Sequence, residues 1–132
     1  MYGLSYDKIY LEELDMGNMK ELYNKRQENI KKKLLKLGFN LSSLGFDYWI
    51  YAIEFKLDVI RKEEYKMEEI YRHIKIITEQ GIEGRTIGCI ERTLRVASST
   101  AKDNIYKEYN IPNNITLTNK SILNLLGGED YE

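Results

Sequence analysis

Cysteine, histidine, proline and tryptophan each occur only once in this chain of 132 residues, and long apolar runs are missing. A single cysteine, Cys89, excludes an internal disulfide framework and is compatible with the reducing cytoplasm. The lone His73 has no second histidine or cysteine at metal-ligand spacing, so no metal or other cofactor is expected. No segment approaches the roughly 20 apolar residues of a membrane span, and the acidic N-terminus is not typical of a secretory signal. These scarcities predict a soluble, cytoplasmic protein.

Residues suited to catalysis are equally scarce. One histidine and one cysteine do not form a recognisable triad, and Gly127-Gly128 is not part of a phosphate-binding loop. Carboxylate pairs such as Glu63-Glu64 lie beside lysines and are typical of surface charge. We therefore expect no enzyme activity and no small-molecule substrate.

Charge is balanced over the chain but unevenly distributed along it. The sequence has 20 Lys and Arg against 21 Asp and Glu, which gives a formal net charge of -1. That balance is not typical of a protein coated with positive charge for nucleic acid. Cations nevertheless concentrate between Lys25 and Lys36 and between Arg85 and Lys102. A local cationic surface matters more to a phosphate backbone than the sum over the chain.

Helical periodicity runs through the chain, and no strand is expected. In the second helix Leu22 lies on the apolar face, and Gly38 is a natural C-terminal stop. Ile77 is expected to face inward. Hydrophobic spacing predicts helices over residues 5–15, 18–37, 46–62, 67–79, 84–102 and 118–126. The sequence therefore predicts an all-α fold, a compact bundle of about six helices that contains a helix-turn-helix.

The segment from Gly84 to Lys102 is the most informative part of the chain. A glycine-containing turn over residues 79–83 joins it to the preceding amphipathic helix, which is the sequence pattern of a helix-turn-helix. At about 100° per residue, one side of the segment is apolar and the other carries arginines. The apolar side consists of Ile87, Ile90, Leu94, Ala97 and Ala101, and the opposite side of Arg85, Gly88, Arg92, Arg95, Ser99 and Lys102. We therefore expect double-stranded DNA to be the partner.

Arg85, Thr86 and Gly88 are predicted to form the surface that contacts bases. A guanidinium in the first turn of a recognition helix can bind the O6 and N7 atoms of guanine. The plainer interpretation of Arg85 is a solvated arginine on a helix face. Gly88 in mid-helix costs about 1 kcal/mol relative to alanine. It indicates close approach of the backbone to DNA, tight packing of another helix, or a function that has been lost.

Phosphate contacts are expected from a second set of residues, which supply affinity without reading sequence. For Arg95 the alternative to a phosphate contact is an ion pair with Glu91, four residues earlier on the same helix. For Thr118 or Asn119 the alternative is that the residue only caps the last helix. Cys89 is expected to be buried or half-buried, since it lies between the two sides of its helix. The predicted phosphate contacts are Arg92, Arg95, Ser99 and Lys102 on the arginine-bearing helix and Thr118, Asn119 and Lys120 at the start of the last one.

Several segments in the right order carry a resemblance to a known family. They are IKKKLLKLGFN, FDYWIYAIEFKL, IYRHI, GRTIGCIERTLRVA and TNKSILNLL. Residues 29 to 126 resemble the C-terminal DNA-binding effector domain of the master stage-zero sporulation transcription factor of spore-forming Firmicutes. The resemblance implies a helical domain that binds DNA through this helix-turn-helix, with the recognition helix over about residues 84–102 in the major groove. Thr86, Ile87 and Gly88 stand where the family has Val-Glu-Arg.

The resemblance also implies a division of the chain. Residues 29–132 form the effector-like domain, and residues 1–28 are a helical extension where the family has a phospho-receiver domain, too short for a receiver of roughly 100–150 residues. We expect a sequence-specific transcription regulator or DNA-binding accessory factor, and a homodimer or a complex with a related regulator is possible. The alternative is a protein-interaction module of the same fold that has lost most DNA affinity and modulates a related regulator.

Overall fold

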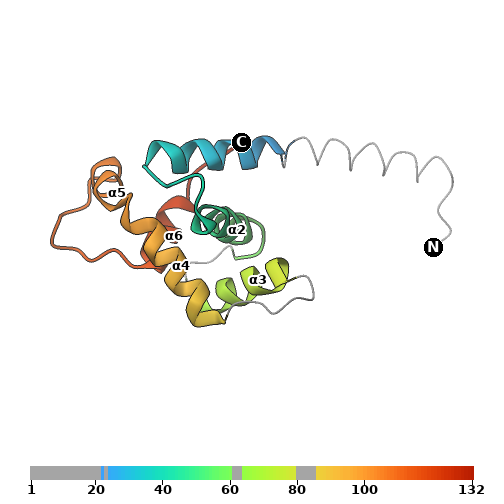
Figure 1. Ribbon diagram of the computed structural model, residues 1–132. Coiled ribbons are helices and arrows are strands. Elements are labelled where there is room, and N and C mark those ends of the chain that lie inside the picture. The colour runs from blue at the N-terminus through green and yellow to red at the C-terminus, as the bar shows by residue number, and fades with distance from the viewer. Residues whose placement is uncertain (1–21, 23, 61–63, 80–85) are drawn as a thin grey trace, which may run out of the picture.

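The computed structural model describes residues 22, 24–60, 64–79 and 86–132, and in these ranges the chain is helical with no strand (Figure 1). The first helix covers residues 24–36. It is followed by α2 (Leu44–Asp58), α3 (Met67–Glu79), α4 (Ile87–Ser99), α5 (Lys102–Glu108) and α6 (Asn119–Leu126). The predicted all-α class and compact bundle are confirmed. The helix predicted over residues 5–15 and the turn predicted at 79–83 lie wholly or mostly outside the described residues, and the division at residue 28 stays a prediction.

Local sequence explains where several helices begin and end. Gly38 adopts a left-handed φ of 95° after the first helix, and Phe39 N–H donates back to the Leu34 carbonyl at 3.0 Å. This is the glycine stop that the sequence predicts. Thr118 caps α6, because its hydroxyl accepts from Ser121 N–H and the Ser121 hydroxyl accepts from Thr118 N–H.

One apolar core holds the helices together. Trp49, Phe46 and Leu94 are at most 1% exposed and lie at its centre. The largest fully buried side chains come from all six helices and are Trp49, Phe46, Ile30, Leu34, Leu37, Ile53, Ile70, Ile74, Ile90, Leu94, Ile105 and Ile122. Ile77, predicted to face inward, is 37% exposed, because the described residues leave the last turn of α3 uncovered. Leu22 is 61% exposed, since the buried side chains of the first helix begin only at Ile30.

The helices α2 and α4 cross closely at Gly45. A Cβ on Gly45 would overlap the Cβ of Ala97 and lie 2.9 Å from the Thr93 carbonyl oxygen. The missing side chain therefore allows the two backbones to meet. Four residues further along α2, the buried indole N–H of Trp49 donates to the Leu94 carbonyl at 2.9 Å. This contact and the glycine together set how α4 is rotated about its own axis.

The C-terminal tail packs on the first helix (Figure 1). Asn29 donates to the Tyr131 carbonyl at 2.6 Å, and the ammonium of Lys33 lies 2.7 Å from Glu108 and 3.1 Å from Glu129. Burial lowers the pKa of Lys33, but the two carboxylates outweigh it and hold that pKa above its ordinary value. Tyr109 completes the cluster by donating to Glu129 at 2.6 Å.

Gly45→Ala is expected to lower the free energy of unfolding by about 1–3 kcal/mol, because the new methyl group overpacks the crossing of α2 and α4. Gly88→Ala is the matched control: among the described residues, a Cβ there has only Thr86 Oγ1 within reach, at 3.9 Å. Because Gly88 lies in the first turn of α4, this variant is expected to leave the free energy of unfolding unchanged or to raise it by less than about 1 kcal/mol, the value for a helix interior. Urea unfolding followed by the fluorescence of Trp49 measures both variants. Equal effects of the two substitutions would contradict the crossing described.

The protein is expected to lose stability at alkaline pH through its buried tyrosines. Burial raises the pKa of Tyr65 to about 12, and burial also raises the pKa values of Tyr109 and Tyr131. A raised folded-state pKa gives stability that is fully present below the unfolded value, about 10, and is lost as pH rises through the folded value. Urea midpoints measured between pH about 9 and about 12 should fall steadily in wild type. The fall should be shallower in Tyr65→Phe, and an identical fall would contradict the assignment.

Candidate nucleic-acid interface

The helix α4 begins later than the sequence predicts. Thr86 has an extended backbone, with φ -69° and ψ 160°, and its hydroxyl accepts from the Cys89 N–H at 3.2 Å. Thr86 is therefore the N-cap, and the predicted start at Gly84 is wrong because this cap stops the helical hydrogen bonding there. Arg85 lies outside the described residues, so its base contact stays a prediction. No acidic residue occupies the first turn of α4, which leaves the positive end of the helix dipole uncompensated.

The two-sided character of α4 is confirmed. Ile90 and Leu94 are buried, and six residues on the remaining surface are exposed. None of these six is acidic. We call this set the outward face of α4, and it consists of Gly88, Cys89, Arg92, Arg95, Val96 and Ser99. The expectation that Cys89 is buried or half-buried is wrong, because Cys89 lies on the exposed side of the first turn of α4.

The glycine at the start of the outward face has no packing role. Among the described residues outside the backbone of α4 itself, only Thr86 Oγ1 lies within 4 Å of the position that a Cβ of Gly88 would take. Tight packing of another helix is therefore wrong as the explanation of Gly88. The small residues Gly88 and Cys89 give the first turn of α4 a low profile, so that another molecule can approach its backbone closely.

The two arginines of the outward face differ in their partners. Arg95 pairs with Glu91 at 3.1 Å, as the i,i+4 alternative expects, and such an exposed pair contributes only about 0.3–0.5 kcal/mol. Arg92 is exposed and forms no ion pair or hydrogen bond within the described part of the chain. Its guanidinium is therefore a donor that a ligand can engage without breaking an internal contact.

The start of α6 is more structural than predicted. Asn119 is 8% exposed, and its amide donates to the Glu91 carbonyl at 3.1 Å and to the Tyr71 hydroxyl at 3.3 Å. Its side chain joins α6 to α4 and α3, and the predicted contact of its backbone amide with DNA stays a prediction. The ammonium of Lys120 lies 5.0 Å from the centre of the Tyr65 ring, a cation–π contact.

Predicted residues from two distant segments meet in one hollow of about 380 Å³. We call it the α4–α6 hollow. Lys102 lines it as the first residue of α5, rather than as part of the preceding helix as predicted. Five of the ten predicted site residues lie around it, namely Arg95, Lys102, Thr118, Asn119 and Lys120. The hollow also includes Glu91, so its charge is mixed.

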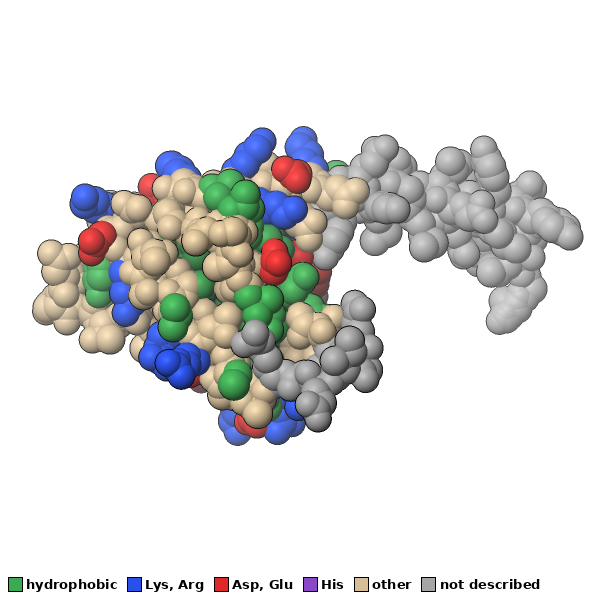
Figure 2. Space-filling model, viewed as in Figure 1, with side chains coloured by type: hydrophobic (Ala, Val, Ile, Leu, Met, Phe, Trp, Pro, Cys, Tyr) green, Lys and Arg blue, Asp and Glu red, His purple; other side chains and the backbone are tan. Residues whose placement is uncertain are grey.

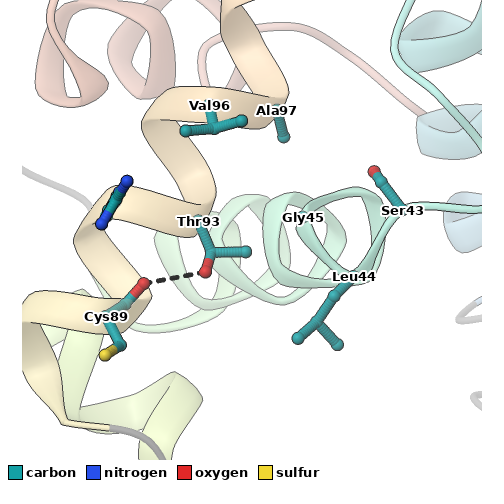
Figure 3. A pocket seen from close by; sticks show the side chains of 8 residues that line it. Ser43, Leu44, Gly45, Cys89, Thr93, Val96 and Ala97 are labelled. Atoms are coloured by element: carbon teal, nitrogen blue, oxygen red, sulfur yellow. Dashed lines mark hydrogen bonds between the residues drawn. The ribbon is translucent and has the colours of Figure 1, made fainter.

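A second hollow, of about 440 Å³, lies between the start of α2 and the outward face of α4 (Figure 3). Sequence reasoning missed this α2–α4 hollow, because Leu44 lies outside the helix predicted over 46–62 and Val96 was placed on neither side of the helix predicted over 84–102. They are 42% and 57% exposed, and an exposed valine among arginines was the signal available. The hollow is lined by Ser43, Leu44, Gly45, Cys89, Arg92, Thr93, Val96 and Ala97.

Cations do not form a single dense patch on the face seen in Figure 2, where lysine and arginine side chains lie in several places with hydrophobic side chains between them. Within the described ranges, no group of three His, Cys, Asp or Glu residues is placed to hold a metal ion. His73 stacks on Phe55 at 4.0 Å between ring centres, and burial lowers its pKa. No helix among the described residues is long and apolar enough to cross a membrane.

Comparison of the chain with models of protein families, with curated proteins and with solved structures gives no match in any of the three. The structure defines an all-α helical bundle. The residues exposed around α4 are the basis from which a function is proposed.

Asn119→Ala is expected to lower the free energy of unfolding by about 1–3 kcal/mol, because it removes the part-buried hydrogen bond of the Asn119 amide to the Glu91 carbonyl. Lys102→Ala, at the neighbouring position of the same hollow, is expected to change stability by less than about 0.5 kcal/mol. Chemical denaturation of the two variants makes the comparison. A stable Asn119→Ala protein would contradict the structural role given to this side chain.

Proposed function

We propose that this protein binds double-stranded DNA by placing the outward face of α4 in the major groove, and that it acts in the cytoplasm as a transcription regulator of the sporulation-effector type. The observation that carries the proposal is the outward face itself, six exposed residues that include Arg92 and no acid. An α-helix fits the major groove, which is about 12 Å wide. The one carboxylate of α4, that of Glu91, is paired with Arg95 at 3.1 Å, so the outward face meets the phosphate walls of that groove with little repulsion.

The support beneath α4 suits this role. Buried residues of α3, Ile70 and Ile74, and of α4, Ile90 and Leu94, belong to the same core, so α4 is held against α3 while its other side is free. Seven residues, 80–86, connect the two helices, which is longer than the turn of three or four residues in most helix-turn-helix proteins. The proposal depends on the exposure of α4 and not on the length of that turn.

The α4–α6 hollow supplies a flank for the phosphate backbone. Lys102 lines it, and the capping box uses only the N–H groups of Thr118 and Ser121. The backbone N–H groups of Asn119 and Lys120 at the N-terminus of α6 then remain as donors, and such termini favour anions. Contacts of this kind fix the position of a protein on the duplex but carry no sequence information.

A protein-interaction module remains the second candidate, and exposed apolar side chains favour it. Val96 is 57% exposed on the outward face, and Ile76 is 73% exposed on α3. A formal net charge of -1 also gives little long-range attraction for DNA. This candidate predicts a defined protein complex and little DNA affinity at any salt concentration.

Arg92→Ala is expected to weaken DNA binding by about 1–3 kcal/mol, the range for a guanidinium contact to a base, and to leave the unfolding free energy unchanged. Fluorescence anisotropy measures this, with one labelled duplex carrying the consensus box of the sporulation factor and one scrambled duplex. Wild type should bind more weakly as salt rises from about 50 to about 200 mM, because phosphate contacts release counterions.

Arg72→Ala is the matched control. Arg72 is an exposed arginine on α3 and pairs with Glu68 at 2.6 Å, so its removal changes the net charge by the same amount as removal of Arg92. Equal losses of affinity in the two variants would mean that binding depends on the net charge of the protein and not on the position of Arg92. Salt-independent or absent binding in wild type would contradict the proposal and favour the protein-interaction module.

A further inference from the structure

The α2–α4 hollow has an apolar floor and one cation at its edge. Gly45 and Ala97 form part of the floor, where the two helices meet, and Leu44 and Val96 form apolar walls. The only charged residue of the lining is Arg92. The hollow is therefore suited to a small apolar group attached to a molecule of negative charge.

Both hydroxyls of the lining already have partners inside the protein. Ser43 Oγ donates to the Asn40 carbonyl at 2.8 Å and accepts from Phe46 N–H at 3.2 Å. Thr93 Oγ1 donates to the Cys89 carbonyl at 2.8 Å (Figure 3). Apart from the exposed Cys89, the lining presents to a ligand the apolar walls and the guanidinium of Arg92.

In the major groove, thymine presents a 5-methyl group, and guanine presents two acceptors that match a guanidinium. Arg92 and Val96 are four residues apart on α4, so they are separated by about 6 Å along the helix axis. Stacked bases on one strand are about 3.4 Å apart. Side chains at this spacing can therefore contact bases one or two steps apart.

We propose that the α2–α4 hollow receives the 5-methyl group of a thymine in the major groove while Arg92 donates to a guanine one or two steps away. This inference rests on the proposed function and adds the chemistry by which α4 selects its site. Charge favours DNA as the occupant, since no carboxylate lines the hollow and Arg92 has no partner within the described residues.

Replacement of thymine by deoxyuridine tests the inference, because it removes the methyl group and leaves the pairing intact. A duplex enriched by wild type from a randomised pool is synthesised with thymine and again with deoxyuridine, and both are titrated by fluorescence anisotropy. Wild type is expected to bind the deoxyuridine duplex about fourfold more weakly for each methyl group held in the hollow, the factor that corresponds to burial of one methylene.

Val96→Thr locates the effect, since it keeps the shape of an exposed side chain and replaces a methyl group by a hydroxyl. This variant is expected to discriminate between the two duplexes less than wild type does, although threonine keeps one methyl group that can contact thymine. Val59→Thr is the control, at a valine that is 61% exposed at the end of α2, and it should discriminate as wild type does.

The outcomes separate this inference from the proposed function. Salt-dependent binding with equal affinity for the thymine and deoxyuridine duplexes overturns the inference alone. Discrimination as large as that of wild type in Val96→Thr overturns the placement of the methyl group in this hollow. Absence of enrichment and of salt-dependent binding to any duplex overturns the proposed function itself.

Discussion

The close crossing of α2 and α4 is the constraint on which the rest of the structure depends. Gly45 lets the two backbones meet, since any Cβ there would overlap Ala97, and the indole of Trp49 holds the Leu94 carbonyl at 2.9 Å. With Leu94 directed inward, the opposite side of α4 must face solvent, because an α-helix has 3.6 residues per turn. The exposure of Arg92 and Val96 is thus a consequence of how the core is packed.

That arrangement is compatible with the proposed DNA-binding surface in a chain with net charge -1. Elsewhere in the described structure several cations form ion pairs within the protein. Arg26 donates two hydrogen bonds to Asp58, and Lys33 pairs with Glu108 and with Glu129 of the C-terminal tail. Arg92 instead has no partner in the described part of the chain. Recognition built on one such donor beside an apolar hollow relies on short-range complementarity more than on long-range attraction.

Periodicity predicted most of the helices but not every boundary. The helix over 67–79 agrees with α3, and the one over 118–126 agrees with α6 and its cap, Thr118. The separate helix α5 was missed because the buried line Leu94, Ala101, Ile105 continues across the break at Thr100. The α2–α4 hollow could not be predicted, since it depends on a contact between residues about 50 positions apart, Gly45 and Ala97. Burial of Asn119 has the same origin, a tertiary contact with the Glu91 carbonyl.

The most direct test of the account is a titration of the isotopically labelled protein with duplex DNA, followed by changes in its backbone amide resonances. The account predicts that the largest changes fall on the outward face of α4, at Gly88, Cys89, Arg92 and Val96, with smaller ones at the start of α2 and α6. Changes confined to the first helix and the C-terminal tail, or no changes at all, would contradict it.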